Sequence, residues 1–175
     1  LGAALGLING ALVNVTGLHS FIITLGTQAI FRGATLIVSN SSAVFGFPAS
    51  FTKSISASVL GIPVIAIVAI IVALILAFLT IKTKLGRNIY ALGGNKESAW
   101  YSGINVKLHT LIVFIISGLC AGIAGIVLLG RVGSAEPAAA TGFETYAIAA
   151  AIIGGTSFFG GKGKIHGVVV GGLII

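Results

Sequence analysis

Few side chains in this sequence have the chemistry for acid–base or metal catalysis. The acids are three Glu residues in polar stretches, with no Asp, and the three histidines are far apart. Cys120 is the single cysteine and stands in an apolar run. Paired carboxylates, proton relays and metal clusters all need such groups close together. The sequence therefore predicts no catalytic residue and no metal site among Glu97, Glu136, Glu144, His19, His109 and His166.

A glycine-rich run at 154–163 is the other candidate for chemistry, because loops of this kind can cradle phosphate. The pair Gly161-Lys162 is followed by Gly163, where a Walker A loop requires Ser or Thr. Thr156 stands where that motif requires its first Gly. We therefore expect the chain to bind no ATP and no other cofactor itself. Any nucleotide would be bound by a partner subunit.

The composition places these residues in a membrane protein. Hydrophobic residues make up 57% of the chain and charged residues 7%, and the mean hydropathy is +1.16. Soluble globular domains carry about 25% charged residues. The net charge of +7 does not indicate nucleic acid, because the basic residues are scattered between apolar runs and form no continuous basic face. The predicted surroundings are the lipid bilayer.

Apolar runs define the elements that must position any site. We predict an all-α membrane protein, a polytopic transmembrane helix bundle, in which residues 1–175 are part of one transmembrane domain. Glycines four residues apart, such as Gly2, Gly6 and Gly10, indicate close helix packing. The fifth run is short for a full crossing, which leaves open a short or re-entrant helix. The predicted spans are 1–15, 21–38, 62–81, 108–130, 146–159 and 167–175.

Polar residues inside the first two spans are candidates for a solute pathway. Thr24, Thr27, Gln28 and Arg32 recur at helical spacing. A charged Arg in a span either faces a bundle interior or aqueous cavity, or it snorkels to the interface, and the sequence leaves both open. Asn9 is either a pathway residue or a helix–helix hydrogen-bonding residue.

Basic residues predict the topology. Segment 82–107 holds Lys82, Lys84, Arg87, Lys96 and Lys107. If it is cytoplasmic, loops 39–61 and 131–146 lie outside and 160–166 lies inside, so that inner loops carry seven basic residues against two outside. This arrangement satisfies the positive-inside tendency. Because no carboxylate lies within a span, energy for transport has to come from a partner at this segment.

Several motifs resemble those of the ribose-type sugar permeases of bacterial ABC importers, and together they cover nearly the whole chain. The blocks at 93–95 and 102–104 favour this family over the related branched-chain amino-acid permeases. The motifs are TLGT at 24–27, GRNIYALGGN at 86–95, SGIN at 102–105, GSA at 133–135, AIAA at 147–150 and GGTS at 154–157.

The resemblance implies how the chain works. Such permeases act as two copies, a homodimer or heterodimer, with cytoplasmic ATP-binding subunits and an extracytoplasmic sugar-binding protein. They lie in the bacterial inner membrane as multi-pass proteins and are not themselves enzymes. Residues in 82–107 would couple to the ATPase, with glycines breaking the segment into short helices and turns. The coupling candidates are Gly86, Arg87, Gly93, Gly94, Asn95, Ser102 and Gly103.

Other roles follow from the same resemblance. Arg131, Glu136 and Glu144 are candidate contacts for the binding protein, with plain loop solvation as the alternative. The neutral polar groups of the first spans suit an uncharged, polyhydroxylated solute such as a monosaccharide. Family members are longer, so the N- and C-terminal spans of the family are expected to be missing here. The alternatives are a branched-chain amino-acid or other small-solute ABC permease, an ATP-independent facilitator, and a membrane scaffold subunit.

Overall fold

The computed structural model describes residues 1–59, 61–158 and 160–175. It divides into two compact units: Leu1–Val68 with Leu111–Ala139, and Ala69–Thr110 with Ala140–Ile175. Among the described residues, the regular structure consists of nine helices and two short strands. The predicted all-α class is therefore confirmed.

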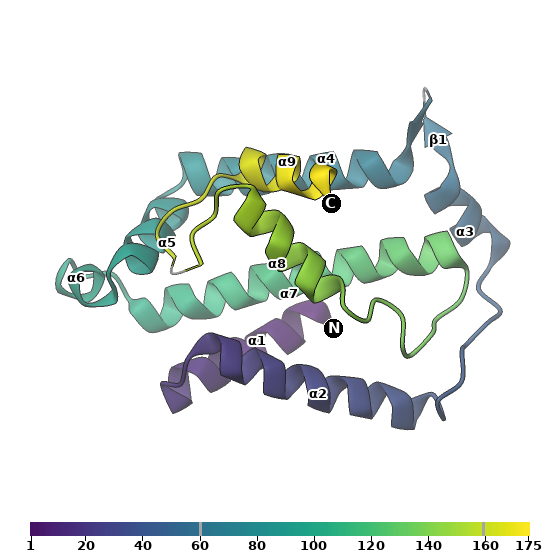
Figure 1. Ribbon diagram of the computed structural model, residues 1–175, viewed down its shortest axis with the longest axis horizontal. Helices are drawn as coiled ribbons and strands as arrows, with labels where there is room; N and C mark the ends of the chain where they lie inside the picture. The colour runs from purple at the N-terminus through teal and green to yellow at the C-terminus, as the bar shows by residue number, and fades with distance from the viewer. Residues whose placement is uncertain (60, 159) are drawn as a thin grey trace. The chain divides into compact units, whose positions relative to one another are not determined.

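The first unit begins with a helical hairpin (Figure 1). Helix α1 (Gly2–Thr16) ends because Gly17 adopts a left-handed conformation with φ 66°, and its N–H donates to the Val13 carbonyl at 3.1 Å. Helix α2 (Ser20–Val38) begins after His19, whose side chain accepts a hydrogen bond from the Phe21 N–H at 3.4 Å. These two caps fix a short connection between α1 and α2.

The segment between α2 and the next long helix has more structure than the sequence predicts. We expected a loop at 39–61, but it contains α3 (Ala49–Ser56) and β1 (Ser58–Val59). Strand β1 pairs antiparallel with β2 (Ile62–Pro63), so that Ser58 lies opposite Pro63. Pro63, which belongs to the predicted span 62–81, therefore lies in a strand, and α4 (Val64–Lys82) begins one residue later.

Glycines bring α1 close to α7 (Val106–Val132). A Cβ atom added to Gly2 would overlap the Gly118 carbonyl, and one added to Gly6 would overlap the Phe114 carbonyl. A Cβ on Gly10 would lie 3.1 Å from the Cα of Leu111. Small residues allow such backbone contact between helices in membranes. The predicted glycine face of the first span is confirmed.

The second unit contains the basic segment and another helical hairpin. Helices α5 (Lys84–Gly94) and α6 (Lys96–Tyr101) follow the end of α4. Helices α8 (Phe143–Ile153) and α9 (Ile165–Ile174) pack against each other, and the loop 154–164 joins them (Figure 1).

Helix α8 is shorter than the predicted span at 146–159. It ends because Gly155 adopts φ 82°, while the Thr156 N–H donates back to the Ala151 carbonyl at 3.0 Å, in the pattern of a Schellman motif. At 1.5 Å per residue, α8 is about 16 Å long, roughly half the thickness of the hydrocarbon core. The predicted end of this span, Phe159, lies outside the described residues.

Within the part of the chain that the structure describes, three helices are long and apolar enough to cross a membrane: α2 and α4 with 19 residues each, and α7 with 27. Helices α1, α8 and α9 are apolar but shorter. No residue of α4 is buried, and side chains such as Leu74 and Phe78 are 64% and 63% exposed. Large apolar side chains exposed along a whole helix need lipid or other protein around them.

We expect Gly118→Ala to destabilise the protein, because its new Cβ would overlap the Gly2 carbonyl and force α1 away from α7. Overpacking of this kind costs about 1–3 kcal/mol. Gly125→Ala on the same helix is the matched control, since its Cβ would meet nothing within 4 Å. The melting temperature in detergent should fall for Gly118→Ala alone. Equal melting temperatures for the two variants would contradict the close helix crossing.

Candidate functional site

A polar groove lies in the first unit, with a volume of about 360 Å³. All five residues that the sequence predicts for a solute pathway line it, from α1 and α2. The other three lining residues were not predicted from the sequence. Phe31 and Thr35 continue the helical spacing of the predicted set, whereas Pro137 comes from a distant loop. The lining residues are Asn9, Thr24, Thr27, Gln28, Phe31, Arg32, Thr35 and Pro137.

The threonine hydroxyls of the groove donate hydrogen bonds to backbone carbonyls of their own helix, α2. Thr24 donates to the Ser20 and Phe21 carbonyls, both at 3.1 Å, and Thr35 donates to the Phe31 carbonyl at 2.8 Å. Thr27, which is only 7% exposed, donates to the Ile23 carbonyl at 3.0 Å. A hydroxyl oxygen that has donated its proton still carries lone pairs. These three side chains can therefore act as acceptors toward the groove.

Asn9 brings a second kind of acceptor to the groove. Its Oδ1 atom is buried and has no hydrogen-bond partner. A buried polar atom left without a partner costs about 1–3 kcal/mol. A helix–helix hydrogen bond, the structural alternative for Asn9, is therefore not made by this oxygen. Asn9 therefore brings to the groove lining a side-chain oxygen whose hydrogen-bonding capacity is unused.

Arg32 is half-buried and lines the same groove. Of its two alternatives, lining a cavity and snorkelling to an interface, this position favours the first. The groove therefore combines neutral acceptors, one cation and the Phe31 ring, with no carboxylate among its lining residues.

The basic segment 82–107 of the second unit is held together by three side-chain caps. The Thr83 hydroxyl accepts from the Gly86 N–H at 3.2 Å and begins α5. Asn95 Oδ1 accepts from the Ser98 N–H at 2.9 Å and begins α6. Asn105 Oδ1 accepts from the Leu108 N–H at 3.0 Å in the first turn of α7. Such N-terminal caps stabilise helix ends by about 1 kcal/mol each.

The glycines of this segment have different roles from one another. The sequence predicts that Gly86 breaks the segment, but Gly86 is buried inside α5, where a Cβ would overlap the Thr80 carbonyl. Its role is close approach to the end of α4, so this prediction is wrong. Gly93 and Gly94 are the last residues of α5, and Gly103 adopts φ 81° in the turn after α6. These three do mark helix ends.

An exposed aromatic pair lies beside this turn and was not predicted. Trp100 and Tyr101 are 63% and 80% exposed, and their ring centroids lie 5.0 Å apart in an edge-to-face arrangement. They line a cavity of about 670 Å³ together with residues of α6 and of the following turn. Arg87, Asn95 and Ser102 of the predicted coupling set are also exposed.

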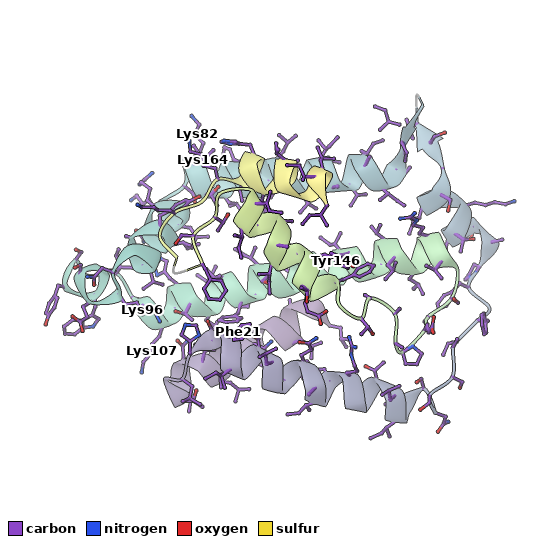
Figure 2. All side chains as sticks on the ribbon, in the orientation of Figure 1. Phe21, Lys82, Lys96, Lys107, Tyr146 and Lys164 are labelled. Carbon is purple, nitrogen blue, oxygen red and sulfur yellow. The ribbon has the colours of Figure 1, made fainter. Side chains whose placement is uncertain are left out.

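Basic side chains gather at one end of the second unit. Lys82, Lys96, Lys107 and Lys164 lie at this end, whereas Tyr146 on α8 lies away from it (Figure 2). The two segments that the sequence places on the inner side, 82–107 and 160–166, both belong to this unit.

The predicted binding-protein contacts are all exposed. Arg131 lies in the last turn of α7, and Glu136 follows Ala135, which forms an isolated antiparallel bridge with Val44. Glu144 lies in the first turn of α8, in the second unit. Among the described residues, no group of three His, Cys, Asp or Glu side chains could hold a metal ion.

A family model described as "Branched-chain amino acid transport system / permease component" matches residues 1–175. The chain is 68% identical over 175 residues to the D-allose transport system permease protein AlsC of Escherichia coli (strain K12), covering 100% of this chain and 54% of that protein. It is 41% identical over 182 residues to the ribose import permease protein RbsC of the same strain, covering 100% of this chain and 56% of that protein.

A third similar protein is the autoinducer 2 import system permease protein LsrD of Photorhabdus temperata, 35% identical over 181 residues, with 100% of this chain and 54% of that protein covered. The chain spans about half the length of the curated relatives it matches. No solved structure matches the chain.

We expect Asn95→Ala to loosen α6, because it removes the cap on the Ser98 N–H, whereas Asn95→Asp keeps an acceptor there. Hydrogen–deuterium exchange of 96–101 should speed up about fivefold in Asn95→Ala, which corresponds to about 1 kcal/mol. Exchange in Asn95→Asp should match the unaltered protein. An unchanged rate in Asn95→Ala would show that the cap is not formed.

Proposed function

The chain belongs to the branched-chain amino acid transport system permease family, and from that premise we propose that it is the membrane subunit of an ATP-driven monosaccharide importer. Two similar proteins are named for the transport of D-allose and the import of ribose, which supports a sugar as the solute. We place the subunit in the bacterial inner membrane as a multi-pass protein.

The observation that carries the proposal is the chemistry of the groove. Its threonine oxygens and Asn9 Oδ1 are acceptors, which match the hydroxyl donors of a sugar. The Phe31 ring offers an apolar surface to the C–H face of the same molecule. We propose that this groove forms part of the solute pathway, with Thr24, Thr27, Gln28 and Arg32 on one wall and Asn9 on the other helix.

The groove favours a neutral sugar over an amino acid. Arg32 could pair with the carboxylate of an amino acid, but the lining offers no carboxylate for the ammonium group. An unpaired ammonium inside a membrane protein is expensive. A sugar makes no such demand, so the branched-chain amino-acid alternative is the weaker one.

The basic end of the second unit is the proposed cytoplasmic side, where α5 and α6 meet the ATP-binding subunits. The exposed Arg87 and the Trp100–Tyr101 pair supply the charge and the apolar anchor that protein interfaces use. ATP is bound and hydrolysed by those partners. A second permease copy and an extracytoplasmic sugar-binding protein complete the proposed assembly, with Arg131, Glu136 and Glu144 as contacts for the latter.

Reconstitution tests this proposal. The intact permease should co-purify with an ATP-binding subunit, and vesicles holding both should take up radiolabelled D-allose or ribose only with ATP and the binding protein present. Uptake without nucleotide would identify a facilitator. Association without uptake under any condition would identify a scaffold, and either result would reject the proposal.

Asn9→Leu separates a pathway role from a packing role. Removing an unpartnered buried oxygen should leave the melting temperature unchanged or raise it, because the oxygen is a cost in the empty groove. The same change should slow ATP-driven uptake roughly fivefold, the factor carried by one net hydrogen bond of about 1 kcal/mol to the sugar.

The control for this change is Asn40→Gly, at an exposed residue whose φ of 49° suits glycine. It should change neither quantity. A lower melting temperature for Asn9→Leu, or unchanged uptake, would remove Asn9 from the pathway.

A further inference from the structure

Helix α5 has two faces with different surroundings. Lys84, Arg87 and Ala91 are exposed and follow one another at helical spacing. Tyr90, Gly93 and Gly94 lie at i, i+3 and i+4 on another face of the helix. This second face meets the loop 154–164, which joins α8 to α9.

Two contacts, a hydrogen bond and a close backbone approach, connect α5 to this loop. The Tyr90 hydroxyl donates to the Gly163 carbonyl at 2.8 Å, and Tyr90 is half-buried. One turn along, Gly93 lies so close to the loop that an added Cβ would stand 2.5 Å from the Gly161 nitrogen. The contact is equally tight from the other side, since a Cβ on Gly161 would stand 2.7 Å from the Gly94 Cα.

The two helices that this loop joins, α8 and α9, are themselves packed backbone to backbone. Added Cβ atoms on Gly154 and Gly167 would overlap the carbonyl of the other residue, and one on Gly171 would overlap the Ala150 carbonyl. The pairs 154 with 167 and 150 with 171 run in opposite directions, so α8 and α9 are antiparallel. Contacts made by backbone have no rotatable side chain that could absorb a displacement.

We propose that α5 moves the α8–α9 hairpin, so that Tyr90, Gly93 and Gly161 are positioning residues that pass the ATP-driven motion into the membrane. The inference rests on the proposed function and adds an element to it. A partner that pushes on the exposed face of α5 displaces the helix as a whole, and with it the adjacent face that carries Tyr90 and Gly93. That face bears directly on the loop, and the loop carries both short helices with it.

The contacts of Tyr90 and Gly93 with the loop can be tested apart from the other contacts of α5. Gly86 packs against Thr80 at the end of α4, and the Asn88 amide lies 3.0 Å from the His109 Nε2 in α7. These connections stay intact when only Tyr90 and Gly93 are changed. The test variants are therefore Tyr90→Phe, which removes one hydroxyl, and Gly93→Ala, which crowds Gly161.

The experiment uses the intact permease with its ATP-binding subunits in vesicles, in a Cys120→Ala background. An environment-sensitive fluorophore is attached either to His166→Cys, exposed in the first turn of α9, or to Ser98→Cys, exposed in α6. ATP should change the signal of both labels in the unaltered protein. In Tyr90→Phe and Gly93→Ala, the α6 label should keep its response while the α9 label loses most of its response.

Transport supplies the second readout. Sugar taken up per ATP hydrolysed should fall about fivefold in Tyr90→Phe, the factor carried by one typical hydrogen bond, while ATP hydrolysis continues. The matched controls are Tyr146→Phe, at an exposed tyrosine of α8, and Gly172→Ala, whose Cβ would meet nothing within 4 Å. Both should behave like the unaltered protein.

The outcomes separate this inference from the proposed function. If the unaltered protein transports sugar but its α9 label never responds to ATP, or if that label responds fully in both variants, the inference is wrong and the function stands. If the unaltered protein shows no ATP-driven uptake, the function is wrong and the inference falls with it. Should Gly93→Ala fail to fold, Tyr90→Phe alone decides, because it removes one atom from the side chain.

Discussion

Backbone-to-backbone approach at glycines is the constraint on which the rest of this structure depends. In lipid, apolar side chains gain nothing by leaving their surroundings for a neighbouring helix, so association rests on close packing and hydrogen bonds. Gly6 and Gly118 give α1 that contact with α7, and Gly154 and Gly167 give it to α8 with α9. Among the described residues, only Leu92 and Ala99 form a buried hydrophobic core. Contacts between small residues replace the large core of a soluble protein.

The membrane environment also determines how a polar groove can exist in so apolar a chain. Polar groups are tolerated in a membrane protein where they face a cavity or find partners. The threonine hydroxyls donate their protons to carbonyls within α2, so their oxygens can still accept hydrogen bonds from a ligand. Asn9 Oδ1 has no such partner, so the groove retains one unsatisfied acceptor. The groove lining thus combines threonine hydroxyls that donate within their own helix with one Asn oxygen that has no partner. This combination fits the weak binding of a hydroxylated solute that we propose.

The sequence predicted what depends on composition and local spacing. Most of the run at 62–81 forms α4 because its residues are almost all apolar, and Thr24, Thr27 and Gln28 share the groove because one helix carries them. Non-local features were missed. Gly86 resembles a helix breaker, and only the Thr80 carbonyl shows why glycine is needed. Pro137 reaches the groove from a loop that lies far from α2 in sequence, which no periodicity reveals.

In the proposed importer, the energy for solute movement is expected to enter away from the groove. Ion-coupled transporters place titrating or ion-binding groups beside the solute, whereas this groove has one cation and no carboxylate in its lining. In the proposed importer we expect a mechanical input instead, and such an input needs a stiff path from the surface into the membrane. Helix α5 offers such a path because its contact with the loop at Gly161 is made by backbone atoms on both sides. A side chain at Gly93 or Gly161 would replace this backbone contact with a side-chain contact, which can rotate and so absorb part of a displacement.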